Sequence, residues 1–359
     1  MWVTVENQPA AFYSSHFELS AFPLCRGRSG LCHDDVIDRK YPMKDGKMKH
    51  ASMKLMVVLL GLLPSTVCGQ VQLQLKYPDG RGERSLSEIN TKQTLTLAGM
   101  DIETASKQNF ELLSTNGARN SDGELVTTQK IESMKAELNI SGQQLTFDSA
   151  KPDAPPPGTA LDGLLDVFKA LSKSEWTVTR GKDNRVSSVD GRAEALKSLP
   201  DAMRKAMEKQ LESSYLAEVA NDEMAAIPND AVSVGDTWTH QTTLRLEAGQ
   251  TFEFDKTYQY EGVVEKDGKS LHKISEQTTD VDYDMEANDA SPLKYVSSDL
   301  TIAGSEGEIL FDNETGLVVS RIAKVHITGP IVFQAGGTDL PSTVDLTIGQ
   351  STATSILSP

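Results

Sequence analysis

Four acidic residues that alternate with other side chains offer the most direct chemistry in this sequence. On a β-strand, alternate side chains share one face at a spacing of about 7 Å, so two or three of these carboxylates could bind a hard cation such as Ca²⁺. Charged strand faces also protect sheets from aggregation. The pattern predicts a solvated acidic face, with a Ca²⁺ site as the alternative, at Asp280, Asp282, Asp284 and Glu286.

The histidines form no catalytic pattern that the sequence can identify. His240, His272 and His326 are the histidines after residue 69, and each stands alone in a strand-like segment. A Ser-His-Asp site would need partners from distant positions. The G-x-S-x-G, H-E-x-x-H and G-x-x-x-x-G-K-S/T patterns do not occur. We therefore assign no catalytic residue and no cofactor-binding residue.

Apolar residues recur with a period of two along most of the chain after residue 69. Residues 71–77 alternate in this way before the turn residues 78–80, which predicts a strand that enters a hairpin. Trp176 and Val178 continue the pattern, and we expect Trp238 to begin another strand as a core aromatic rather than a ligand-stacking one. Turn pairs such as Ser141-Gly142, Asp267-Gly268 and Gly336-Gly337 separate the strands. The spacing favours antiparallel pairing.

Two segments have helical spacing instead. After Pro155-Pro156-Pro157, residues 159–172 carry apolar residues on one helical face, and residues 199–222 carry an apolar residue at every fourth position from Met203 to Val219. Amphipathic helices must bury their apolar stripes, and the apolar face of a sheet is available. The predicted fold is α+β, a large curved antiparallel sheet with two amphipathic helices packed on it.

Residues 70–359 are expected to form a single strand-rich domain. The alternative divides them into two lobes, residues 70–190 and 226–359, joined by the second helix. Neither half contains enough helix to cover its own sheet, so a shared core leaves less apolar area exposed.

An export signal is predicted upstream of that domain. The apolar run Leu55–Leu63 follows basic residues and precedes small ones, so residues 48–69 read as a signal peptide cleaved after Gly69. Residues 1–47 are then an upstream extension, and translation begins at Met48 or Met53. The run is too short to span a bilayer, and no later segment is longer, so no transmembrane segment is expected. The protein is predicted to be periplasmic or extracellular.

Processing changes the composition of the chain. Residues 1–69 hold all three cysteines, with 8 basic and 6 acidic residues, so 27 basic and 45 acidic residues remain and the net charge becomes −18. Such a surface repels nucleic acid. Cleavage before Cys68 with lipid attachment is the alternative, although the preceding Ser65-Thr66-Val67 matches a lipoprotein site poorly.

Four stretches together resemble a known family. VQLQLKYPDG, LAGMDIETASKQNFEL, IPNDAVSVGDTW and GEILFDNETGLV, in this order, are similar to exported bacterial proteins with domain of unknown function 6263. The resemblance implies export and a strand-rich fold. It implies no activity and no functional residues.

Two functions from different classes are consistent with these observations. The first is a non-enzymatic binding or envelope-associated protein, with an apolar small ligand or an envelope protein as partner. The adaptable side chains of Met203 and Met207 suit such a surface. The second is an extracytoplasmic hydrolase that uses paired carboxylates, for which the sequence identifies no pair.

The export hypothesis predicts the N-terminus of the protein recovered from its host. Mass spectrometry is expected to find Gln70 as the first residue, because signal peptidase cleaves after small residues. A peptide from residues 1–42 in the native precursor would contradict the assignment of the extension.

A calorimetric titration with Ca²⁺ tests the acidic face. A bound cation would release or absorb heat and raise the melting temperature. If the titration gives no heat and the melting temperature is unchanged, the face is only solvated.

Overall fold

The computed structural model describes residues 69–152, 158, 161–246, 249–286 and 293–358. The upstream extension, residues 48–68 of the predicted signal peptide and the Pro155-Pro156-Pro157 segment lie outside these residues. Within the described part of the chain, no helix is long and apolar enough to cross a membrane.

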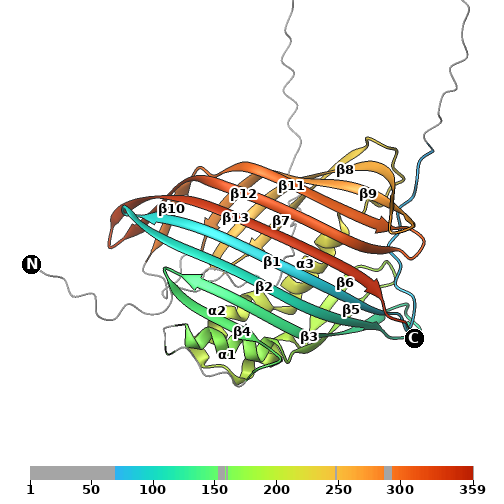
Figure 1. The fold of residues 1–359 in the computed structure, drawn as a ribbon, viewed down its shortest axis with the longest axis horizontal. Helices are drawn as coiled ribbons and strands as arrows, with labels where there is room; N and C mark the ends of the chain where they lie inside the picture. Colours follow the sequence, from blue (N-terminus) through green and yellow to red (C-terminus); the bar gives the residue numbers. More distant parts are fainter. Residues whose placement is uncertain (1–68, 153–157, 159–160, 247–248, 287–292, 359) are drawn as a thin grey trace, which may run out of the picture. The chain divides into compact units, whose positions relative to one another are not determined.

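Thirteen strands form one antiparallel sheet, with the order β6-β5-β3-β2-β1-β13-β12-β11-β9-β8-β7 (Figure 1). β6 and β7 end this path without pairing to each other, so the sheet is open, while β4 pairs with β3 and β10 pairs with β12. The strands are β1 (Gly82–Leu97), β2 (Met100–Asn116), β3 (Leu125–Ile140), β4 (Gln143–Asp148), β5 (Glu175–Arg180), β6 (Val186–Asp190), β7 (Thr237–Arg245), β8 (Gln250–Lys266), β9 (Lys269–Met285), β10 (Lys294–Ser298), β11 (Thr301–Asp312), β12 (Leu317–Ala335) and β13 (Thr338–Ile356).

Short helices lie between β4 and β7. They are α1 (Asp162–Leu171), the 3-10 helix η2 (Arg192–Ser198), α2 (Asp201–Met207), the 3-10 helix η3 (Glu208–Leu211) and α3 (Ser213–Met224). The sheet curves so that α3 lies along its inner face (Figure 1). The predicted fold class, a large curved antiparallel sheet with helices packed on it, is confirmed.

Two-residue turns join several long strands, as the sequence predicts. At Ser141-Gly142, Asp267-Gly268 and Gly336-Gly337 both residues have positive φ values. Two consecutive positive φ values define the type I′ turn, whose twist matches that of the flanking strands. The hairpin between β1 and β2 uses Ala98-Gly99 in the same way.

The second predicted helix is divided at Glu212, which has an extended ψ of 132° between η3 and α3. An apolar residue at every fourth position explains the break. Four residues turn an α-helix by about 400°, so such a stripe rotates by about 40° per step and reaches the opposite side after four steps. Dividing the segment lets Met207 and Leu216 both contact one core cluster.

The predicted first strand is wrong. Val71 forms a single backbone bridge with Val232, and residues 72–79 join no ladder. The alternation in this segment has a different cause, because an extended chain that packs on a core also buries every second side chain. Leu73 is buried and Leu75 is half-buried against the same cluster.

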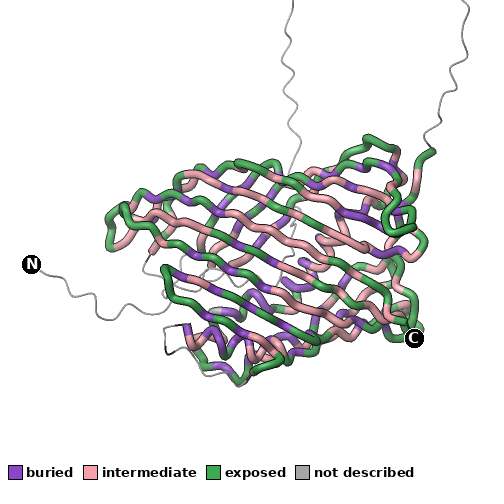
Figure 2. Tube along the Cα trace, in the orientation of Figure 1, coloured by how far each residue is buried: buried purple, intermediate pink, exposed green. Residues whose placement is uncertain are grey.

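Buried and exposed residues alternate along the strands (Figure 2). α1, α2 and α3 pack on β3 to β6, where Phe147 and Phe168 stack with ring centroids 5.7 Å apart. A second cluster joins side chains of β7, β8 and β9 to those of β12 and β13 without a helix between them, including Phe254 and Leu346. The helices therefore cover only part of the inner face.

Candidate functional site

Two neighbouring cavities lie between α3 and the inner face of the sheet. The smaller has a volume of about 100 Å³ and is lined by β7, β8, β9, β11, β12, β13 and α3. The larger has a volume of about 300 Å³ and extends under β1, β2, β3 and β5. Glu223, Arg321 and Gln350 line both, so they form the boundary between the two cavities.

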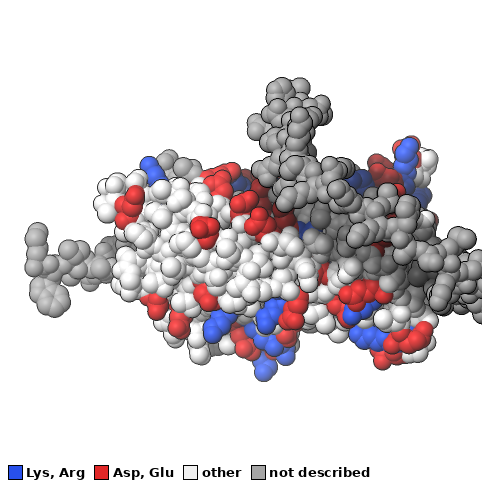
Figure 3. Space-filling view, turned by 90° about the horizontal axis from the view of Figure 1, so that it is seen from above, with Lys and Arg blue, Asp and Glu red and all other residues white. Residues whose placement is uncertain are grey.

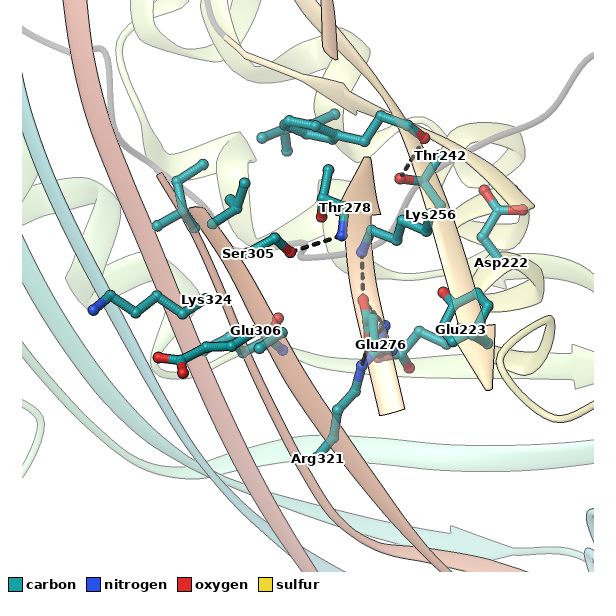
Figure 4. Close-up of a pocket in the computed structure, with 17 residues that line it drawn as sticks. Asp222, Glu223, Thr242, Lys256, Glu276, Thr278, Ser305, Glu306, Arg321 and Lys324 are labelled. Atoms are coloured by element: carbon teal, nitrogen blue, oxygen red, sulfur yellow. Dashed lines mark hydrogen bonds and ion pairs between the residues drawn. The ribbon is translucent and has the colours of Figure 1, made fainter. Parts of the chain in front are cut away.

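A cluster of buried charges occupies this boundary. The Glu276 carboxylate on β9 accepts hydrogen bonds from Lys256 Nζ at 2.9 Å, Arg321 Nε at 3.1 Å and Arg321 Nη2 at 2.8 Å. The side chain of Glu276 is only 3% exposed. Figure 4 shows Glu276 between Lys256 and Arg321. Lys256 lies on β8 and Arg321 on β12, so the cluster connects strands that are distant in the sequence.

A β-bulge places Glu276 inside the molecule. Asp255 is paired with Asp280, whereas Lys256 is paired with Thr278, so Thr279 is an extra residue on β9. A bulge of one residue exchanges the two faces of a strand. Val281 and Tyr283 face inwards after the bulge, and Thr278 and Glu276 face inwards before it. In a regular strand without the bulge, Glu276 would lie on the same outer face as Asp280, Asp282 and Asp284.

The cations around Glu276 determine its protonation. Burial alone would raise the pKa of this carboxyl, but the charges and hydrogen bonds of Arg321 and Lys256 outweigh burial and lower it to about 2. The same pair raises the pKa of Arg321 despite the burial of the guanidinium. Glu276 is therefore an anion, and both of its carboxylate oxygens accept hydrogen bonds from Lys256 or Arg321.

α3 contributes two more carboxylates to the site. Glu223 Oε1 lies 3.7 Å from Arg321 Nη1, and burial raises the pKa of Glu223 to about 7 although Arg321, Arg180 and Lys256 oppose the shift. Its side chain keeps 37% of its surface accessible because it lines both cavities. Asp222 Oδ1 lies 2.8 Å from His240 Nε2, and the pKa of Asp222 is raised, mainly by burial.

The larger cavity combines apolar walls with arginines. Its apolar lining includes Ile89, Phe110, Leu112, Ile131, Leu216 and Val219. Arg180 lies over the Tyr77 ring at 4.2 Å and Arg192 over the Trp176 ring at 4.3 Å. Arg81 Nη2 pairs with Glu83 at 2.6 Å. Four arginines and two glutamates line this cavity in a chain whose net charge is −16.

The predicted cation site lies elsewhere. Asp280, Asp282 and Asp284 are exposed on the outer face of β9, and Glu286 follows the strand and pairs with Lys209. Among the described residues, no group of three or more His, Cys, Asp or Glu side chains is arranged to hold a metal ion. Acidic side chains form several separate groups on the face seen in Figure 3. Ca²⁺ binding at these carboxylates stays a prediction.

Trp238 and the three histidines discussed from the sequence each contact another side chain of the fold. Trp238 begins β7 as expected, stacks on Tyr258 at 5.7 Å and packs against a core cluster. His272 Nδ1 lies 2.7 Å from the Tyr260 hydroxyl, and burial lowers its pKa. His326 pairs with Asp345 near the surface. His240 contacts the site through Asp222.

Fold and site together define an open-sheet protein with an internal, partly charged cavity. The chain belongs to a family of unknown function, DUF6263, whose profile matches residues 122–318. That match includes α3, Trp176, Arg192 and Glu276, and ends before Arg321. The family resemblance seen in the sequence is confirmed. No curated protein matches the chain.

Solved structures give only weak likenesses. A structure titled "lipid-protein interactions in lipovitellin" has a TM-score of 0.36 at 8% identity, over 79% of this chain and 26% of that one. The COG4313 outer membrane channel from Pseudomonas putida F1 has a TM-score of 0.22 at 8% identity, over 79% and 98% of the two chains. The translocator domain of the autotransporter NalP from Neisseria meningitidis has a TM-score of 0.20 at 7% identity, over 77% of this chain and 90% of that one. This chain spans about a quarter of the lipovitellin chain. TM-scores below 0.5 do not indicate a function shared with these three proteins.

Replacing Glu276 by Gln tests the charge cluster. The variant leaves Arg321 and Lys256 without their shared counter-charge, and breaking a buried pair in this way typically costs about 3–5 kcal/mol. We expect a loss of that size in the free energy of unfolding measured with denaturant.

Glu261→Gln is the matched control, because Glu261 pairs with Lys273 at a more exposed position. Its expected loss is within about 1 kcal/mol. Equal small losses in the two variants would show that the buried cluster contributes little.

The raised pKa of Glu223 predicts a pH dependence. The folded state binds a proton at about pH 7, whereas an unfolded Glu does so near its ordinary pKa of 4.5. Stability of the wild type should therefore increase relative to Glu223→Gln as pH falls through 7, with the gain complete below about 4.5. Denaturation curves from pH 8 to pH 5 measure this difference. Parallel pH profiles for the two proteins would refute the assignment.

Proposed function

We propose that this protein is a non-enzymatic binding protein that holds a small amphipathic ligand between α3 and the inner face of its sheet. The observation that carries the proposal is the cavity of about 300 Å³, which is lined by apolar side chains and by charged groups that converge at one boundary. Ligand pockets are typically about 300–1,000 Å³, mostly apolar, with a few placed polar groups.

The rigidity of the site supports binding. The charged groups at the boundary of the two cavities lie on β8, β9, β12 and α3 rather than on loops, and Glu276 holds Lys256 and Arg321 in fixed positions. A preorganised cavity loses little entropy when a ligand enters. The aromatic rings of Tyr77 and Trp176 also order two arginines before any ligand is present.

One observation favours the alternative function, a carboxylate-dependent hydrolase. Glu223 and Glu276 both line the smaller cavity, and their pKa values are about 7 and about 2. Such a divergence is typical of an acid and its ionised partner. Against it, the Glu276 oxygens accept hydrogen bonds from Lys256 and Arg321, which leaves this carboxylate a poor nucleophile or base. We therefore prefer the binding function.

Export is part of the proposal. The apolar run within residues 48–69 and the acidic, cysteine-free remainder support a periplasmic or extracellular, envelope-associated protein. Residues 1–68, including Cys68 with its alternative lipid attachment, lie outside the described residues.

Binding of an uncharged fluorescent probe, N-phenyl-1-naphthylamine, tests the function. Its emission is expected to rise when it enters the larger cavity of the wild type. Ala220 lines that cavity from α3, so Ala220→Phe should fill part of it and weaken probe binding about tenfold or more.

Ser214→Phe provides the control, because Ser214 is exposed on the same helix. This variant should bind the probe as the wild type does. An absence of probe binding by the wild type, or equal binding by Ala220→Phe and wild type, would contradict the proposed site.

A further inference from the structure

Arg192 is a buried cation that forms no ion pair with any residue that the structure describes. The residue is 8% exposed and lines the larger cavity at the start of η2. Among the described residues its Nε and Nη2 atoms have no hydrogen-bond partner. Burial lowers its pKa to about 10, so the guanidinium stays charged near neutral pH. A buried charge in this state is costly unless an anion compensates it.

The structure holds this guanidinium firmly. Gly191 before it has φ 104°, and a Cβ there would lie 3.1 Å from the Glu175 carbonyl oxygen and 3.2 Å from Trp176 Cα. Trp176, over whose ring the guanidinium lies, donates its Nε1 hydrogen to Gln129, which in turn donates to Ser114. Substitution of Gly191 would therefore displace the ring and the cation together.

Each of the other arginines of the cavity has at least one side-chain or backbone partner, although Nε of Arg81 and Nε of Arg180 have none among the described residues. Arg81 pairs with Glu83, and Arg321 donates from Nε and Nη2 to Glu276. Arg180 donates to the Asn184 carbonyl oxygen and contacts the Met224 sulfur. The pair between Arg321 and Glu276 shows which group satisfies a buried guanidinium here, a carboxylate held by charge-assisted hydrogen bonds.

We propose that Arg192 binds the carboxylate of an amphipathic ligand whose hydrocarbon part lies along the apolar wall of the larger cavity. This inference rests on the proposed binding function and adds the chemical class of the ligand, a medium-chain or long-chain carboxylic acid. Ile89, Phe110, Leu112, Ile131, Leu216 and Val219 supply the apolar wall. The cation attracts the carboxylate, and the surrounding wall excludes water from the ion pair.

Calorimetric titration with decanoate and with decanol tests the inference, because the two molecules share a chain and differ in charge. The wild type is expected to bind decanoate about 10- to 100-fold more tightly, the usual effect of a hydrogen bond to a charged group. Arg192→Met should abolish this preference while decanol binding remains. Arg192→Lys keeps the charge and should keep part of the preference, which covers the case in which Arg192→Met does not fold.

Arg204→Met is the control for a general loss of positive charge, because Arg204 lies on α2 and pairs with Asp201 outside the cavity. It should retain the full preference for decanoate. Equal binding of the two molecules by the wild type, or a preference that survives in Arg192→Met, overturns the role of Arg192 and leaves the binding function standing. If neither molecule binds, both proposals fail.

Discussion

The inner face of the sheet has to be covered, and the helices are too short to cover all of it. α3 has 12 residues and is about 18 Å long, whereas the 19 residues of β12 or β13 extend over about 60 Å. Near β7 to β9 the two walls of the curved sheet pack on each other, and near β3 to β6 the helices fill the space. The cavities lie between these two regions.

The charge cluster stabilises the part of the inner face that borders the two cavities, although its side chains do not fill the cavities. Glu276, Lys256 and Arg321 satisfy one another, so polar groups can face the interior beside the cavities under α3. The β-bulge at Thr279 decides this arrangement, because it exchanges the exposed and buried faces of β9. Because of this bulge, β9 carries exposed carboxylates at Asp280, Asp282 and Asp284 on its outer face and the buried carboxylate of Glu276 on its inner face.

Sequence reasoning predicted the sheet, its antiparallel pairing and the turns at Ser141-Gly142 and Asp267-Gly268, because alternation and turn residues are local signals. It missed the cluster, since the bulge at Thr279 leaves no signature in residue type and Arg321 reaches Glu276 only through the sheet. It misassigned residues 71–77, where alternation reflects packing without a ladder. A stripe at every fourth position indicates that one straight helix could not bury all of these residues on one side, but it does not locate the break at Glu212.

The central claim is that the space under α3 holds a ligand. Native mass spectrometry of the protein purified from its own host tests this claim most directly. The account predicts a bound species that adds a discrete mass to the folded chain and is released on denaturation, with less of it in the Ala220→Phe variant. A folded protein that carries only its own mass in every preparation, and that gains none when host lipid extract is added, would contradict the account.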